Sequence, residues 1–160
     1  KRNSFDLNAN FVPFETWMQD KSSFVLLIVE DNVPDVDLKL IEKIKHLPQQ
    51  QQDKLIFASS FDLITQNIKK AFPRQLYNLG MAPHTRLLML TDLFLESIAK
   101  IEADFVLSPL NETHRPYLNP AMAAELQRRH IPLIIGPIQS ETQIPTEIRP
   151  FISGILLSQP

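Results

Sequence analysis

The chain has 160 residues, of which 44% are hydrophobic and 21% charged, and its formal net charge at pH 7 is −2. These values are typical of one globular domain, and the scattered Lys and Arg residues exclude the clustered basic surface that nucleic-acid binding needs. The absence of cysteine excludes disulfides and thiolate metal sites.

No stretch of the sequence predicts a membrane span. The longest aliphatic run, Phe24–Val29, is far shorter than the roughly 18 apolar residues of a spanning helix. We therefore expect a soluble protein, cytoplasmic or periplasmic, and the composition does not decide between these compartments.

Apolar runs and amphipathic segments alternate along the chain. Residues 1–22 are expected to form a lead-in with a short helix, and residues 23–160 a single α/β domain. The apolar run Ser23–Glu30 predicts a strand, and apolar residues at helical spacing over Asp35–Leu47 predict a helix. The polar tract Gln49–Gln52 is expected to be a loop.

The same strand-and-helix unit is expected to repeat. Lys54–Ser59 predicts a strand, and Asp62–Phe72 a helix with Asp62 as its cap. Arg86–Thr91 (RLLMLT) is expected to be the third strand, followed by a helix over Asp92–Ile101.

Three more strands complete the pattern. Asn119 followed by Pro120 predicts a helix start, because an Asn cap and a proline at the first position both favour it. The remaining expected elements are strands at Asp104–Ser108, Ile131–Ile135 and Gly154–Leu157 and helices at Ala121–His130 and Thr146–Ile152.

Continuous apolar strands that alternate with helices predict an α/β fold with a parallel sheet of about six strands. Two arrangements fit, an open doubly wound sheet and a segment of a (β/α) barrel. Leu26–Asn32 resembles the first strand and acidic pair of a receiver domain. However, Asp92 lies too far downstream of Asp31 to be the phosphate acceptor, and Ile155–Gln159 lacks the expected Lys.

A barrel family matches more of the chain. From Phe11 to Pro160 the sequence resembles the glycerophosphodiester phosphodiesterases, in the order and approximate spacing of its segments. The most specific matches are Ser59–Phe61 and the ending Gly154–Pro160 (GILLSQP). The other matching segments are Val12–Trp17, Leu27–Glu30, Leu55–Asp62, Ala103–Ser108, Asn119–Met122 and Ile131–Ile135.

The resemblance implies the C-terminal part of a TIM-type barrel, with its site at the C-terminal ends of the strands. Glu30 corresponds to the family's metal-binding Glu, so it is the candidate ligand for Ca²⁺ or Mg²⁺. Asn32 stands where the family has a Lys, Gln139 ends a segment that has lost its aromatic residue, and Ser158 replaces an Asp. With Asp31 and Ser60, these residues are the candidates for the barrel mouth.

No residue is assigned as catalytic. The family's H-R-G and E-N segments, which carry its two catalytic histidines, have no counterpart in this sequence. His46 and His130 end predicted helices, where a cationic ring suits the helix dipole. His84 and His114 are expected in loops.

Three functions follow as hypotheses. The first is a catalytically degenerate phosphodiesterase-like domain that acts as a binding or assembly module, without a cofactor, through the open edges of its sheet. Its partner would be another protein or another copy of the chain. The alternatives are a portion of an active metal-dependent phosphodiesterase that uses Ca²⁺ or Mg²⁺, and a receiver-like signalling domain.

Overall fold

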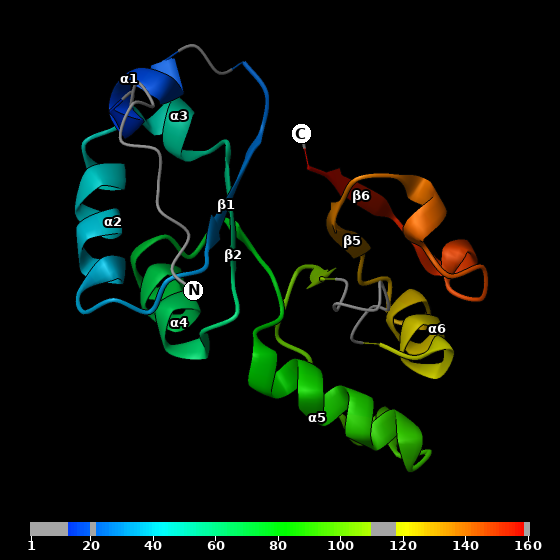
Figure 1. Cartoon of the computed structure of the whole chain (residues 1–160). Helices are drawn as coiled ribbons and strands as arrows, with labels where there is room; N and C mark the ends of the chain where they lie inside the picture. The colour runs from blue at the N-terminus through cyan, green and yellow to red at the C-terminus, as the bar shows by residue number, and fades with distance from the viewer. Residues whose placement is uncertain (1–12, 20–21, 110–117, 159–160) are drawn as a thin grey trace.

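The computed structural model describes residues 13–19, 22–109 and 118–158 (Figure 1). Strands and helices alternate along this part of the chain, as the sequence predicts. The strands are β1 (Val25–Val29), β2 (Leu55–Ser59), β3 (Leu76–Tyr77), β4 (Val106–Ser108), β5 (Leu133–Ile138) and β6 (Gly154–Leu157).

The α-helices differ widely in length. They are α1 (Phe14–Gln19), α2 (Val36–Lys45), α3 (Gln49–Gln52), α4 (Asp62–Ala71), α5 (Met81–Asp92) and α6 (Pro120–Arg128). Three short 3₁₀ helices, η1 (Glu96–Ile98), η2 (Glu141–Gln143) and η3 (Arg149–Phe151), lie in the second half of the chain.

The six strands form two parallel three-stranded sheets, with the orders β1-β2-β3 and β4-β5-β6. Val25 is in register with Leu55, and Val106 with Leu133. One isolated parallel bridge, between Asn78 and Phe105, connects the two sheets. The predicted α/β class with six parallel strands is confirmed, and the described strands do not close into a barrel.

The strands follow one another in space in their order along the chain. This is the winding of a barrel wall, in which each strand pairs with the next. In a receiver-like doubly wound sheet, by contrast, the first strand lies between two later ones. Here β1 lies at the edge of its sheet.

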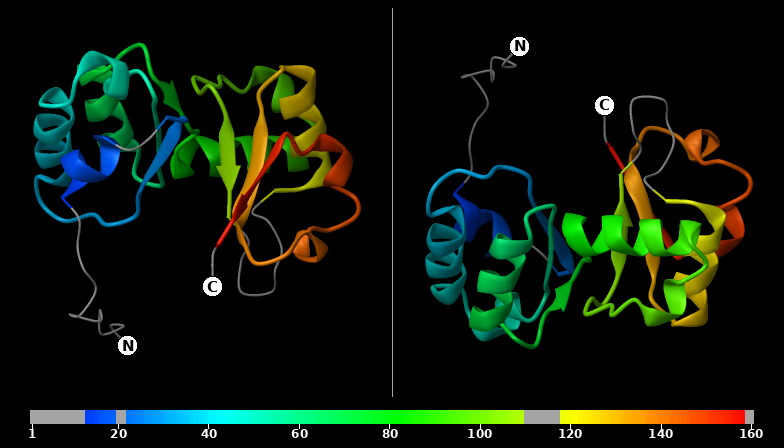
Figure 2. Two further views of the ribbon diagram at one scale, coloured as in Figure 1. Left: turned by 90° about the horizontal axis from the view of Figure 1, so that it is seen from above. Right: turned by 90° about the horizontal axis from the view of Figure 1, so that it is seen from below.

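Each sheet has its own hydrophobic core, on the side that the helices cover (Figure 2). In the first core, Phe57 of β2 stacks on Phe72 and Tyr77, with ring centroids 6.2 and 5.5 Å apart. Met18 of α1 is fully buried there, so this helix of the expected lead-in contributes to the core. The second core forms around Val106, with residues of α5, α6 and β5.

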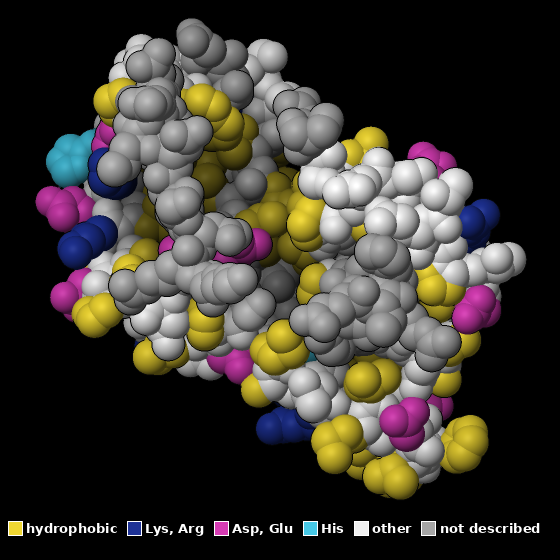
Figure 3. All heavy atoms as spheres, viewed as in Figure 1, with side chains coloured by type: hydrophobic (Ala, Val, Ile, Leu, Met, Phe, Trp, Pro, Cys, Tyr) yellow, Lys and Arg dark blue, Asp and Glu magenta, His cyan; other side chains and the backbone are white. Residues whose placement is uncertain are grey.

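The opposite face of the strands lacks such a cover. Side chains alternate between the two faces of a strand, and those of Ile28 and Leu76 on this face are 37% and 47% exposed. Hydrophobic side chains line a hollow between the two halves of the molecule (Figure 3). We call this side of the strands the inner face.

The predicted third strand is wrong. Arg86–Thr91 lies within the helix α5, and the third strand is the two-residue β3. The run RLLMLT contains four consecutive apolar residues, Leu87–Leu90, so its period does not separate strand from helix. In the structure His84, Leu87 and Thr91 are buried at helical spacing.

Three other predicted elements differ in detail. Asp92 ends α5 instead of starting the next helix, and Gln49–Gln52 is the helix α3 instead of a loop. The helix expected over Thr146–Ile152 is reduced to the single 3₁₀ turn η3. α3 and η3 have four residues or fewer, and so short a segment cannot show a helical period.

The predicted start of α6 is confirmed. The Asn119 side chain accepts a hydrogen bond from the Met122 backbone N–H at 2.7 Å, and Pro120 occupies the first turn. The helix ends at Arg128, and His130 beyond it adopts a left-handed conformation with φ 57°. His46 is the C-cap of α2, as expected.

Candidate functional site

Because all described strands are parallel, their C-terminal ends lie at one edge of the molecule. Glu30, Ser60, Gln139 and Ser158 each directly follow a strand and therefore occur along this edge. Asp31 and Asn32 continue from Glu30. The structure thus brings the predicted residues to a common edge, spread over two sheets.

Glu30 and Asp31 are exposed at the end of β1. A calcium site needs 6–8 oxygen ligands, and a magnesium site needs at least one or two carboxylates in octahedral geometry. In the described part of the chain no group of three His, Asp or Glu side chains converges. The residues present therefore do not make a calcium cage, and Glu30 stays a predicted ligand.

Two other predicted residues form hydrogen bonds with nearby residues. The Ser158 hydroxyl donates to the Ile138 carbonyl at 3.2 Å. The Gln139 backbone N–H donates to the side chain of Gln143 at 2.8 Å. Ser158 therefore helps to attach the end of β6 to β5, which is a structural role.

Asn32 lines a surface cleft of about 450 Å³ between the loop after β1 and the helix α4. On the same cleft Asn67 donates to the Asp37 carboxylate at 2.6 Å. This hydrogen bond lowers the pKa of Asp37.

Two buried polar residues join the strand ends, and sequence reasoning missed both roles. The Ser59 hydroxyl donates to the Val29 carbonyl at 3.0 Å and accepts from the Phe61 N–H at 3.1 Å. The Asn78 side chain accepts from the Ser59 N–H at 2.8 Å and donates to the Leu79 carbonyl at 2.9 Å. The polar Asn78 within the apolar run LYNLG was the available signal.

A small cavity of about 20 Å³ lies beside this network. It is lined by Ser60, Asn78, Leu79, Met81, His84, Leu107 and Pro109. His84, expected in a loop, is instead buried in the first turn of α5. The cavity has space for about one water molecule. The other loop histidine, His114, lies outside the described residues.

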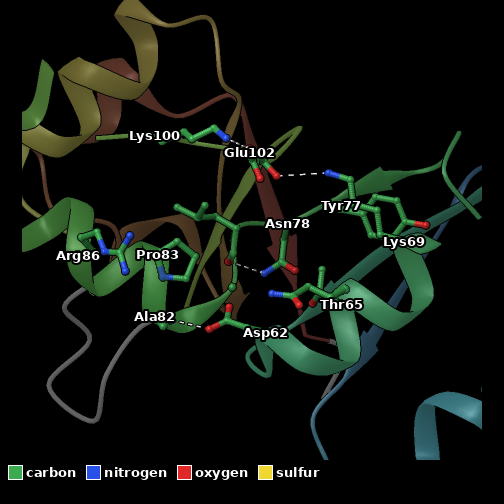
Figure 4. A pocket seen from close by; sticks show the side chains of 13 residues that line it. Asp62, Thr65, Lys69, Tyr77, Asn78, Ala82, Pro83, Arg86, Lys100 and Glu102 are labelled. Atoms are coloured by element: carbon green, nitrogen blue, oxygen red, sulfur yellow. Dashed lines mark hydrogen bonds and ion pairs between the residues drawn. The ribbon is translucent and has the colours of Figure 1, made fainter. Parts of the chain in front are cut away.

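A larger cleft of about 420 Å³ opens between α4 and α5, next to the junction of the two sheets (Figure 4). Lys100 forms an ion pair with Glu102, which raises the pKa of Lys100 and lowers that of Glu102. The Lys69 amine lies 5.6 Å from the centroid of the Tyr77 ring. Burial, and secondarily the Asp104 charge, raises the pKa of Tyr77.

Asp62 crosses from α4 to the start of α5. Its carboxylate accepts from the Ala82 N–H at 3.3 Å, so it supports the start of α5. The sequence predicts Asp62 as the cap of α4, but its side chain makes no capping hydrogen bond there. A Cβ atom on Gly80 would lie 1.8 Å from an Asp62 side-chain oxygen, so the Asp62 carboxylate occupies the space that a larger residue would need. With Lys69, Arg86, Lys100 and Glu102, the cleft carries charges of both signs and suits a small polar ligand.

Neither comparison with known proteins adds a function. No family model matches the chain, and no curated protein matches it. The resemblance to glycerophosphodiester phosphodiesterases therefore stays a prediction. No helix in the described ranges has the length and apolar character required to cross a membrane.

Proposed function

We propose that the chain is a catalytically degenerate, phosphodiesterase-like domain that acts as a binding or assembly module. The observation that carries this proposal is the openness of the sheet. β1 and β6 are edge strands, and no described strand pairs with their outer sides. Unpaired strand edges are natural docking surfaces for another chain.

The site supports the same proposal. Asn32 and Ser158 replace the Lys and Asp of the family pattern. The Ser158 hydroxyl donates its hydrogen bond to the Ile138 carbonyl. Glu30 is not joined by two further His, Asp or Glu side chains among the described residues. A barrel-like wall that has lost these groups retains its edges and its inner face.

The orientation of β1 defines how its edge can be tested. Val25 donates its backbone N–H to Lys54, on the side of β2. Because successive residues of a parallel strand direct their backbone groups to opposite sides, the backbone groups of Ile28 face outward. Proline at position 28 therefore removes an outward N–H and spares the β1–β2 ladder.

We expect Ile28→Pro to weaken association at the β1 edge at least tenfold, and Ile28→Val, which keeps the N–H, to leave it unchanged. Sedimentation over a range of concentrations measures self-association, and affinity capture measures binding of another protein. If Ile28→Pro changes neither self-association nor binding of another protein, the β1 edge is not the docking surface.

Hydrolysis assays test the enzymatic alternative. We expect no calcium- or magnesium-dependent turnover of a glycerophosphodiester by the full-length gene product. Metal-dependent turnover that Glu30→Ala abolishes would favour an active phosphodiesterase over the proposed module.

A further inference from the structure

Large hydrophobic side chains are exposed together at the C-terminal end of α5. Figure 3 shows them at the lower right of the molecule. Soluble proteins seldom expose such clusters unless they bind something. We call this cluster the apolar tip, and its members and exposed fractions are Met89 (63%), Leu93 (65%), Phe94 (86%), Leu95 (45%) and Ile98 (71%).

Two backbone hydrogen bonds fix the conformation of the tip. Leu95 donates its N–H to Leu90 at 2.8 Å, and Phe94 donates to Thr91 at 3.2 Å. These two bonds form the Schellman motif that ends many helices, in which the left-handed position is usually glycine. Phe94 occupies that position, with φ 58°.

A phenylalanine in this position is unfavourable for two reasons, its backbone conformation and its exposure to water. Its Cβ is strained in the left-handed region, and its ring is almost fully exposed to water. Strained conformations cluster at functional sites. His130 has the same conformation after α6, so the exposure of Phe94 is what distinguishes it. Fold stability does not explain Phe94, but insertion into a complementary apolar surface would.

A groove of about 380 Å³ on the same chain has suitable chemistry. It lies between η2, η3 and β6, and its apolar lining consists of Ile144, Ile152 and Ile155. Thr142 and Arg149 are exposed on its rim. This volume falls within the range of roughly 300–1,000 Å³ of sites that enclose small ligands, which is enough space for a protruding aromatic ring.

A charged group beside each surface favours a protein partner. The Asp92 carboxylate is exposed at the end of α5, next to the tip, whereas one oxygen of the Glu96 carboxylate is buried. Arg149 on the groove offers Asp92 an opposite charge, and Glu141 lies on the same groove, so we place Asp92 on the Arg149 side of the contact.

We propose that the apolar tip of one copy inserts into the groove of a second copy of the same chain. Because the tip and the groove are different surfaces, the contact is head-to-tail and produces a ring or an open chain of copies. The groove includes Ile155 of β6 but the contact does not use the β1 edge. Ile28→Pro should therefore leave this association unchanged, which distinguishes its failure from failure of the β1 docking surface.

Phe94→Gly tests the tip without endangering the fold, because glycine suits the left-handed position. Thr142→Glu tests the groove, because it places a carboxylate on the rim, which opposes both the apolar tip and the adjacent Asp92. We expect each variant to associate at least tenfold more weakly than the wild type in sedimentation experiments. Leu63→Ser removes a leucine that is 69% exposed on α4 and should not change association.

Mixing the two variants provides the decisive measurement. Phe94→Gly keeps an intact groove and Thr142→Glu an intact tip, so an equimolar mixture should form one-to-one dimers and nothing larger. The proposal is overturned if the wild type stays monomeric, if Thr142→Glu has no effect, or if the mixture forms no mixed dimer. A tip-to-tip contact instead predicts that Thr142→Glu associates with itself as the wild type does and that no mixed dimer forms. Phe94-dependent binding of a monomeric wild type to phosphatidylcholine vesicles would also overturn it.

Discussion

Gly136 shows how a single residue determines the contact between two strands. Its φ is +140°, in the region that L side chains rarely adopt, and an added Cβ would lie 2.3 Å from the Leu156 carbonyl oxygen. The register between β5 and β6 shifts between Ile135 and Ile138, directly around this glycine. The close approach of the two backbones therefore depends on the missing side chain.

We expect Gly136→Ala to reduce the free energy of unfolding by more than about 2 kcal/mol, because both the conformation and the space exclude a methyl group. Gly154→Ala is the matched control. Its Cβ would lie 3.6 Å from Ile134, an ordinary contact, and should change stability by less than about 1 kcal/mol. Urea unfolding measures both, and equal effects would contradict this account.

Sequence reasoning placed several individual residues correctly. Asn119 and Pro120 start a helix because capping depends on residues close together in the chain. Asp62 starts α4 as predicted, but its carboxylate makes no capping hydrogen bond there and accepts instead from Ala82, twenty residues further along the chain. The local sequence carries no signal of such a contact.

At the scale of elements, α6 is attached to its surroundings by a buried carboxylate. Glu125 is 6% exposed and accepts hydrogen bonds from Arg128 at 2.7 Å and Arg129 at 2.5 Å. Arg129 also donates to the carbonyls of Glu96 and Ala99, next to η1. The cluster connects α6 to the segment that follows α5.

This cluster predicts a pH dependence of stability. Hydrogen bonds from Arg128 and then Arg129 lower the pKa of Glu125 from 4.5 to about 2. A lowered pKa contributes stability above the pKa of the unfolded chain, and this stability is lost as the pH falls through the folded value. Glu125 should therefore contribute about 3 kcal/mol at pH 6 that disappears by about pH 2.

Glu125→Gln removes this contribution, so its deficit relative to the wild type should be large at pH 6 and shrink towards pH 2. Unfolding by urea at several pH values measures the difference. Glu147→Gln, at an exposed position, should show no such trend. A Glu125→Gln deficit that stays constant with pH would contradict the assignment.

Long elements with a clear hydrophobic pattern were predictable from the sequence, and short ones were not. The long apolar runs of β1, β2 and β5 indicated strands because each is a continuous apolar segment of strand length. β3 has only two residues, and its identity depends on pairing with β2. From the sequence alone, Arg86–Thr91 is a better strand candidate than Leu76–Tyr77. In the folded chain it is part of a helix that packs His84, Leu87 and Thr91 towards the core.

At the scale of the whole molecule, two hydrophobic cores are joined at a narrow junction. Asn78 and Phe105 form the isolated bridge between the sheets. Backbone hydrogen bonds from Leu79 to Phe105 and from Asp104 to Tyr77, at 2.9 and 3.0 Å, reinforce it. Units with separate cores and few shared bonds can open separately.

We therefore expect the two sheets to open with different free energies. In native-state hydrogen exchange at increasing urea, amides of β1 and β2 should form one group and amides of β4 and β5 another. A single common opening energy for both groups would show that the junction couples the two cores fully.

The sequence by itself determined the α/β class, the parallel strands and the edge at which the candidate residues occur, because these depend on local periodicity and strand direction. Only the tertiary structure decided that the sheet divides between β3 and β4 and that Ser59 and Asn78 join the strand ends. It alone also revealed the exposed apolar tip around Phe94. These features arise from contacts between distant segments, and exposure and pairing exist only once the chain has folded.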